Sequence, residues 1–183
     1  MKNIILGVTG SIAAYKAADI AHRLFKNGFH VDVIMTVGAT KFITPFTFRT
    51  LTKSPVFTDV FEDDFPNDVK HISLAKKADI VLIAPATANC IGKIAGGIGD
   101  DMLSTTILAI KNIPVLIAPA MNTNMWENPI VQDNVTKLKK YGYRFIEPKE
   151  GLLAEGSFGK GPLADVDDII KAVDLELQNV KKD

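Results

Sequence analysis

Short apolar runs rich in β-branched residues alternate along this chain with segments in which apolar residues recur at helical spacing. The clearest runs lie at residues 3–8, 29–35, 79–84 and 113–118. Uninterrupted apolar runs of this length are typical of strands buried on both faces, and neighbouring parallel strands need a helical crossover between them. The alternation therefore predicts an α/β fold: a doubly wound parallel sheet with helices on both faces, in three αβα layers.

The segments between the runs predict the helices and loops. We expect a helix at 12–26 that is closed by Gly28, two short helices within 39–52, and an acidic loop at 62–68. Further helices are expected at 101–110, 129–141 and from Asp165 onward, with a strand at 143–146 and then a glycine-rich loop. Loops at 9–11, 85–90 and 119–126 each follow a strand, so the sheet should present all three at one edge.

Composition limits the classes of function. The chain has 183 residues, 21 basic and 21 acidic side chains, and one cysteine. We expect a single domain over residues 1–183 with no intrachain disulfide, no nucleic-acid partner and no membrane span. No secretory signal is recognisable at the amino terminus, and the single cysteine fits a reducing compartment, so a cytoplasmic location is expected. Three dispersed histidines give no metal-ligand spacing, so no metal is expected.

Small and hydroxyl-bearing residues mark the ends of several predicted strands. Gly10 and Ser11 open a helix directly after the first strand, which suits a phosphate, although taken alone they are better explained by a serine N-cap after a glycine turn. Thr36 ends the second strand, and Thr87 with Asn89 follows the third. The chain lacks the G-x-G-x-x-G spacing of dinucleotide-binding folds and the lysine of a P-loop.

The stretch from Pro119 to Trp126 groups a proline, Asn122, Met121 and Met125 with the only tryptophan, just past a buried strand. This P-x-M-N-x-x-M-W pattern resembles the substrate-binding motif of the FMN-dependent cysteine decarboxylases. That family includes enzymes of coenzyme A biosynthesis that act on phosphopantothenoylcysteine, and lantibiotic enzymes that act on peptidyl-cysteine. Trp126 fits either a site wall or the core.

Other segments carry the same resemblance, which extends over about residues 3–168. The stretch 9–16 is similar to the family's opening, 85–90 to its P-A-S-A-N-T motif, and 99–103 to its G-x-x-D-N-L segment. The resemblance implies a Rossmann-like, flavodoxin-like fold and FMN as the cofactor, with its phosphate near Ser11 and Thr36. The FMN contacts that it implies are Gly10, Ser11, Ile12, Thr36, Thr87, Ala88, Asn89, Cys90 and Ala120.

His71 begins a segment, 71–79, that resembles the family's catalytic H-I-x-L-A-x-x-A-D motif. The resemblance implies that His71 is the base, and imidazole suits proton transfer near neutral pH. Asn122 is expected to hold the substrate carboxylate, with Met125, Ala154 and Gly156 in contact with the substrate.

One position departs from the family pattern. The flexible flap of the coenzyme A enzymes carries a cysteine that helps to complete the reduction of the product, and here Glu155 stands in its place within 152–162. Glu155 cannot perform thiol redox chemistry, although it could donate a proton if its pKa were raised. We expect the glycines at 156, 159 and 161 to make the flap a mobile lid.

The leading hypothesis is therefore decarboxylation of phosphopantothenoylcysteine to phosphopantetheine, through thioaldehyde and enethiolate intermediates, with Glu155 in a catalytic and substrate-binding position. The alternatives are a peptidyl-cysteine oxidative decarboxylase and a non-catalytic flavin-binding regulatory subunit. A flavin prenyltransferase has the same fold but does not explain the intact P-x-M-N-x-x-M-W pattern. The resemblance also implies a homo-oligomer, a trimer or a multiple of trimers, and a separately encoded ligase.

Overall fold

The computed structural model describes residues 1–61 and 68–179. Its strands are β1 Asn3–Val8, β2 His30–Met35, β3 Val56–Phe57, β4 Ile80–Ala86, β5 Val115–Pro119, β6 Arg144–Phe145, β7 Glu150–Leu152 and β8 Phe158–Lys160. Its helices are α1 Ala14–Lys26, η1 Ala39–Lys41, α2 Pro45–Thr52, α3 Lys70–Lys77, α4 Ala88–Gly96, α5 Met102–Ala109, α6 Thr123–Trp126, α7 Pro129–Lys140 and α8 Val166–Asn179. Within these residues no helix is long and apolar enough to cross a membrane.

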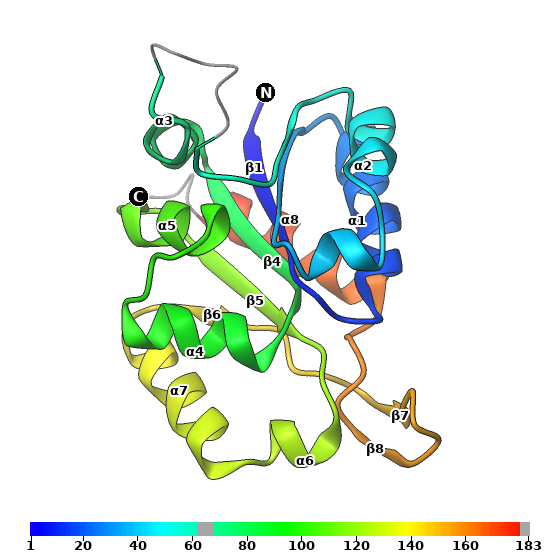
Figure 1. The fold of residues 1–183 in the computed structure, drawn as a ribbon. Coiled ribbons are helices and arrows are strands. Elements are labelled where there is room, and N and C mark those ends of the chain that lie inside the picture. Colours follow the sequence, from blue (N-terminus) through cyan, green and yellow to red (C-terminus); the bar gives the residue numbers. More distant parts are fainter. Residues whose placement is uncertain (62–67, 180–183) are drawn as a thin grey trace.

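Six parallel strands form the central sheet in the order β3-β2-β1-β4-β5-β6. This is the strand order of a doubly wound dinucleotide-type fold. Successive strands are added on one side of β1 up to β3, and on the other side from β4 onward, so the order of the strands reverses between β1 and β4. The predicted fold class is confirmed (Figure 1). The reversal leaves a crevice beyond the carboxyl ends of β1 and β4, where such sheets place their ligands.

Two apolar cores cover the two faces of the sheet. Ile4, Leu6 and Val8 point to the face that is packed by α1, α2 and α8, while Ile5 points to the face that is packed by α3, α4, α5 and α7. This alternation follows from the period of two in a strand. At Gly7 a Cβ atom would lie 2.7 Å from Leu103 Cδ1, so the glycine lets α5 lie close to the sheet.

The predicted elements agree with the structure to within a few residues. Gly28 has φ +87°, the left-handed conformation expected of the residue that closes α1. The strand β3 was not predicted, because two residues carry too little pattern, and its pairing with β2 exists only in the folded chain. Apart from Asp68, the predicted acidic loop at 62–68 lies in the segment that the structure does not describe.

The predicted glycine-rich loop is instead an antiparallel hairpin of β7 and β8, in the register Glu150–Lys160, Gly151–Gly159 and Leu152–Phe158. In Figure 1 this hairpin projects beside α6, at the end of the molecule to which β4 and β5 lead. The prediction of a loop was wrong because the strands are three residues each and owe their form to pairing with one another.

Candidate active site

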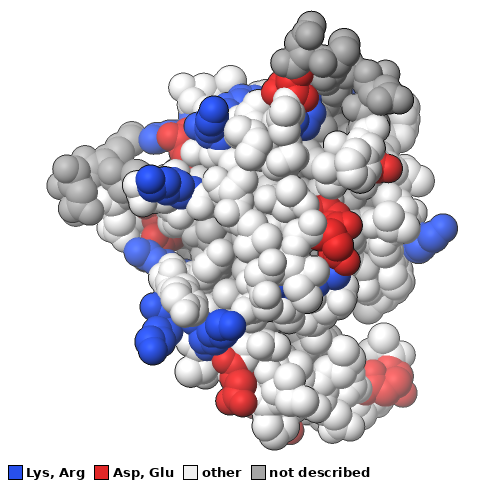
Figure 2. Space-filling view, turned by 60° about the vertical axis from the view of Figure 1, so that its left-hand side comes forward, with Lys and Arg blue, Asp and Glu red and all other residues white. Residues whose placement is uncertain are grey.

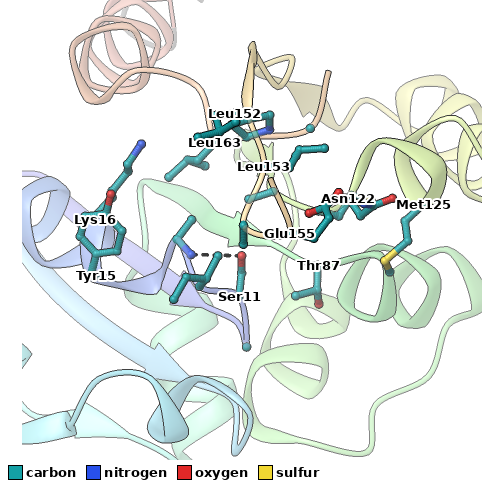
Figure 3. Close-up of a pocket in the computed structure, with 18 residues that line it drawn as sticks. Ser11, Tyr15, Lys16, Thr87, Asn122, Met125, Leu152, Leu153, Glu155 and Leu163 are labelled. Carbon is teal, nitrogen blue, oxygen red and sulfur yellow. Dashed lines mark hydrogen bonds between the residues drawn. The ribbon is translucent and has the colours of Figure 1, made fainter. Parts of the chain in front are cut away.

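A cavity of about 480 Å³ lies at the carboxyl ends of β1, β4 and β5, with the β7–β8 hairpin along one side (Figure 3). The residues that line it come from the three predicted strand-end loops, from α1 and from the hairpin. They are Gly10, Ser11, Ile12, Ala13, Tyr15, Lys16, Thr87, Ala120, Met121, Asn122, Met125, Leu152, Leu153, Ala154, Glu155, Gly161, Pro162 and Leu163. The prediction that three loops meet at one edge of the sheet is thus confirmed.

At the first loop, small residues bring two strand ends close together. A Cβ atom at Gly10 would lie 2.9 Å from the backbone carbon of Gly38, so no larger residue fits there without a shift of the backbone. The hydroxyl of Ser11 accepts a hydrogen bond from the Ala13 N–H at 3.3 Å, and α1 begins only at Ala14. Thr36 accepts from the Ala39 N–H and lies outside the lining of the cavity.

At the second loop, hydroxyl groups hold β1 and β4 in register. Thr9 donates from its hydroxyl to the Pro85 carbonyl at 2.7 Å and accepts from the Thr87 N–H at 3.0 Å. Thr87 lines the cavity and also caps α4, since its hydroxyl accepts from the Cys90 N–H at 3.3 Å. Burial raises the pKa of the Cys90 thiol to about 12, so this cysteine is a buried thiol and not a reactive one.

At the third loop, the side chain of Asn122 makes contacts in two directions. Its carbonyl oxygen accepts from the Asn124 N–H at 2.8 Å and so caps α6, which fixes the amide nitrogen toward the cavity. That nitrogen donates to the Glu155 carboxylate across from it. Met121 and Met125 line the cavity, whereas Trp126 is only 4% exposed and belongs to the core.

The hairpin is attached to this third loop through close backbone contact. The Met121 N–H donates to the Gly161 carbonyl at 3.0 Å. A Cβ atom added at Gly161 would lie 2.2 Å from the Met121 carbonyl oxygen. One added at Gly159 would lie 2.4 Å from Thr123 Oγ1. Of the three glycines predicted to make a mobile lid, these two therefore serve close approach, and only Gly156 has a positive φ, +95°.

Glu155 lies at the turn of the hairpin and is held as a carboxylate. The pKa of Glu155 is lowered by a hydrogen bond from its own backbone N–H, then by Ser157, and least by Asn122. The Ser157 hydroxyl donates at 2.8 Å to the same oxygen atom that receives the Asn122 amide. A raised pKa, which a proton-donor role would require, is not found in this conformation.

His71 lies apart from this cavity. It is on the first turn of α3 and lines a second, smaller cavity of about 280 Å³, together with Phe57, Asp59, Val60, Phe61, Asp68, Val69 and Lys70. The two cavities share no lining residue. Within one chain the structure therefore does not bring His71 to Asn122.

Most of the predicted site residues lie together. Those that line the main cavity are Gly10, Ser11, Ile12, Thr87, Ala120, Asn122, Met125, Ala154 and Glu155. Those that do not are Thr36, His71, Ala88, Asn89, Cys90 and Gly156. Sequence reasoning missed Tyr15, Lys16 and Leu163; the available signal for the first two was their place in the stretch 9–16, which resembles the family's opening. In the described part of the chain no group of three His, Cys, Asp or Glu residues is placed to hold a metal ion.

Comparison with proteins of known sequence gives close relatives. A probable phosphopantothenoylcysteine decarboxylase of Streptococcus mutans is 49% identical over 177 residues, which are 96% of this chain and 99% of that protein. The coenzyme A biosynthesis bifunctional protein CoaBC of Bacillus subtilis is 48% identical over 170 residues, which are 93% of this chain but 42% of that protein. The chain thus spans less than half of the bifunctional relative.

Two solved structures that are similar to this chain are also decarboxylases. A cysteine-to-serine mutant of PPC decarboxylase, complexed with pantothenoylaminoethenethiol, is similar with a TM-score of 0.87 at 32% identity, covering 95% of this chain and 97% of that one. The FMN-dependent cysteine decarboxylase SpaF has a TM-score of 0.85 at 34% identity, covering 98% and 97%. The family model described as Flavoprotein matches residues 1–178. The chain therefore belongs to the flavoprotein family that contains the FMN-dependent cysteine decarboxylases.

Proposed function

We propose that this protein is an FMN-dependent decarboxylase that acts on phosphopantothenoylcysteine in coenzyme A biosynthesis. The observation that carries the proposal is the Asn122 amide, which already donates a hydrogen bond to the carboxylate of Glu155, an exposed residue that lines the cavity. A substrate carboxylate has the same acceptor atoms and can take the place of the Glu155 carboxylate. The relatives that act on cysteine-derived substrates support the same assignment.

The residues present fit FMN. The amino-terminal end of α1 faces the cavity beside Gly10 and Ser11, and a helix end of this kind favours a phosphate group. Ala120 and Thr87 also line this part of the cavity, and Thr87 adds a hydroxyl. When bound, FMN supplies an acceptor for the hydride that the cysteine Cβ must lose before CO2 can leave.

The side chains of this chain then have distinct tasks. Asn122 orients the substrate carboxylate, and Met121 and Met125 give an adaptable apolar wall around it. His71 is the proposed base that accepts a proton during oxidation of the thiol-bearing carbon. Leu153 and Leu163, which are buried, extend this apolar wall.

Because His71 lines a different cavity, we propose that catalysis needs a homo-oligomer in which His71 of the partner subunit reaches the Asn122 cavity. The resemblance favours a trimer or a multiple of trimers. The exposed side chains of Ile98 and Leu108 suit burial in such a contact, and Leu108 is on α5, which packs against α3. Figure 2, which brings this side of the molecule forward, shows a largely uncharged middle to the face.

We further propose a cytoplasmic location.

Glu155 gives a reason to expect an unsaturated product. The resemblance places a redox-active cysteine at this position, and a carboxylate cannot replace a thiol in reduction. The PPC decarboxylase mutant that lacks a cysteine was solved with pantothenoylaminoethenethiol. The second candidate function, oxidative decarboxylation of a peptidyl-cysteine, is favoured by the same substitution.

Mass spectrometry of the product decides among these functions. The purified protein, loaded with FMN, is incubated separately with phosphopantothenoylcysteine and with a peptide that ends in cysteine. A loss of CO2 from the small molecule supports the proposed function, with the product either saturated or two hydrogens lighter. A loss of CO2 and two hydrogens from the peptide alone would establish the second candidate, and no product from either would favour a regulatory flavin-binding subunit.

A further inference from the structure

A buried carboxylate lies on the central sheet outside the lining of both cavities. Asp32 on β2 is only 4% exposed. It alternates with Val31 and Val33, so its side chain points to the same face as Ile34, the face that is packed by α3 and α5. A carboxylate among apolar side chains is costly unless its charge is paired. The partners of Asp32 are therefore important for the elements around it.

Lys77, in the last turn of α3, is the charged partner of Asp32. Its ammonium group donates to Asp32 Oδ2 at 2.9 Å and lies 2.8 Å from His30 Nε2. The same imidazole nitrogen lies 3.0 Å from Asp32 Oδ1. One nitrogen atom cannot donate a proton to the carboxylate and accept one from the ammonium at the same time. Lys77 therefore balances the charge of Asp32 whichever tautomer His30 adopts.

The apolar packing of α3 is limited, so polar contacts matter for its position. The helix has eight residues, of which Leu74 and Ala75 are buried. Its N-cap residue, Val69, makes no side-chain capping hydrogen bond with the described residues. The ion pair of Lys77 with Asp32 thus attaches the end of a lightly packed helix to β2.

The residues just after α3 provide a second attachment, to β1. Asp79 accepts hydrogen bonds from the Lys2 ammonium and from the Asn3 N–H, both at 2.7 Å. A helix that is attached at one point can pivot about it, whereas two points on different strands set its direction. The ion pair of Lys77 with Asp32 supplies the attachment that lies within the helix itself.

The direction of α3 decides where His71 lies. His71 is on the first turn, six residues before Lys77, which is roughly 9 Å along the helix axis. A helix of this length moves as a unit, so a pivot at its last turn displaces the side chains of its first turn.

We infer that Lys77, through its ion pair with Asp32, is a positioning residue for His71. This inference rests on the proposed function, in which His71 is the base. A misplacement of about 1 Å can cost on the order of 10²-fold in rate. Lys77 lines neither cavity, so its loss should lower kcat and leave KM and the affinity for FMN nearly unchanged.

The kinetic test compares two neighbouring lysines. Lys76 is an exposed cation in the same turn of α3 and forms no ion pair within residues 1–61 and 68–179, so Lys76→Met is the matched control for Lys77→Met. For each FMN-loaded protein, kcat and KM are measured with phosphopantothenoylcysteine. We expect Lys77→Met to lower kcat on the order of tenfold, while Lys77→Arg retains most of it and Lys76→Met retains all of it.

The position of His71 is measured directly, which keeps the inference separate from the proposed function. The chain has three histidines, and His71→Asn assigns the imidazole signal of His71 in a ¹H–¹³C NMR spectrum. We expect this signal to shift in Lys77→Met and to stay in place in Lys76→Met, which removes the same charge from the same turn. A shifted signal supports the inference even if wild type decarboxylates nothing, and an unmoved signal overturns it whatever happens to kcat.

Asp32→Asn tests the same ion pair from the other side. It leaves no unpaired charge in the core, so it decides the question if Lys77→Met does not fold. We expect the same fall in kcat and the same displacement of the His71 signal. A fall in Tm with the His71 signal and kcat unchanged would make the ion pair purely structural and would overturn the inference.

Discussion

Replacing Gly161 with alanine should displace the hairpin from the substrate loop. The new Cβ atom would lie 2.2 Å from the carbonyl oxygen of Met121, and this oxygen belongs to the backbone, so it cannot turn away as a side chain can. Separating the two segments would also weaken the 3.0 Å hydrogen bond from the Met121 N–H to the Gly161 carbonyl. Gly161 is buried, so solvent does not relieve the overlap.

The expected magnitude follows from these contacts. Overpacking at a close contact costs about 1–3 kcal/mol, and the weakened hydrogen bond adds about 0.5–1.5 kcal/mol. In a chain of this size 1 kcal/mol corresponds to a shift of about 2–4 °C in Tm, so Tm should fall by several degrees. Because the hairpin also holds Glu155, Leu152 and Leu153 at the cavity, turnover should fall even where the sheet remains folded.

Gly151→Ala is the matched control in the same hairpin. Its Cβ atom would lie 3.5 Å from Pro162 Cγ, an ordinary van der Waals contact, and its φ is not positive. Both variants are compared with wild type by thermal unfolding in the presence of FMN and by decarboxylation rate. If Gly161→Ala melts and reacts like Gly151→Ala, the hairpin is not seated through Gly161 and the reasoning is refuted.

Four further substitutions test the proposed site. His71→Asn should retain FMN but lose decarboxylation by on the order of 10²-fold or more, because it removes a general base; near-normal turnover would leave His71 a structural role. Asn122→Asp should raise KM by placing a carboxylate against the substrate carboxylate, with a loss of roughly 1.5–3 kcal/mol in binding, and unchanged binding of a substrate analogue would contradict the carboxylate contact. Wild type should release the enethiol-type product with reduced flavin, and Glu155→Cys should give saturated product, both measured by mass spectrometry. Cys90→Thr should leave the product unchanged, since that thiol is buried. If wild type already makes saturated product, the proposal that Glu155 stops the reaction at the unsaturated product is wrong.

The sequence predicted much of the site because parallel strands have a fixed geometry. Once the apolar runs were assigned to parallel strands, the loops that contain Ser11, Thr87 and Asn122 had to meet at the carboxyl edge of the sheet. No knowledge of side-chain packing was needed for that step. The same reasoning could not decide whether Trp126 was wall or core, since both positions suit an aromatic residue after a strand.

Local pattern thus determined the αβα layers, the strand-end loops and the close of α1 at Gly28, because each depends on residues close together in the chain. Only the tertiary structure decided that residues 150–160 form a hairpin, that Gly161 lets it approach Met121, and that Lys16 faces the cavity. It also placed His71 in a separate cavity. These features depend on contacts between segments distant in the sequence, and the spacing of residues along one segment has no information about which other segment will pack against it.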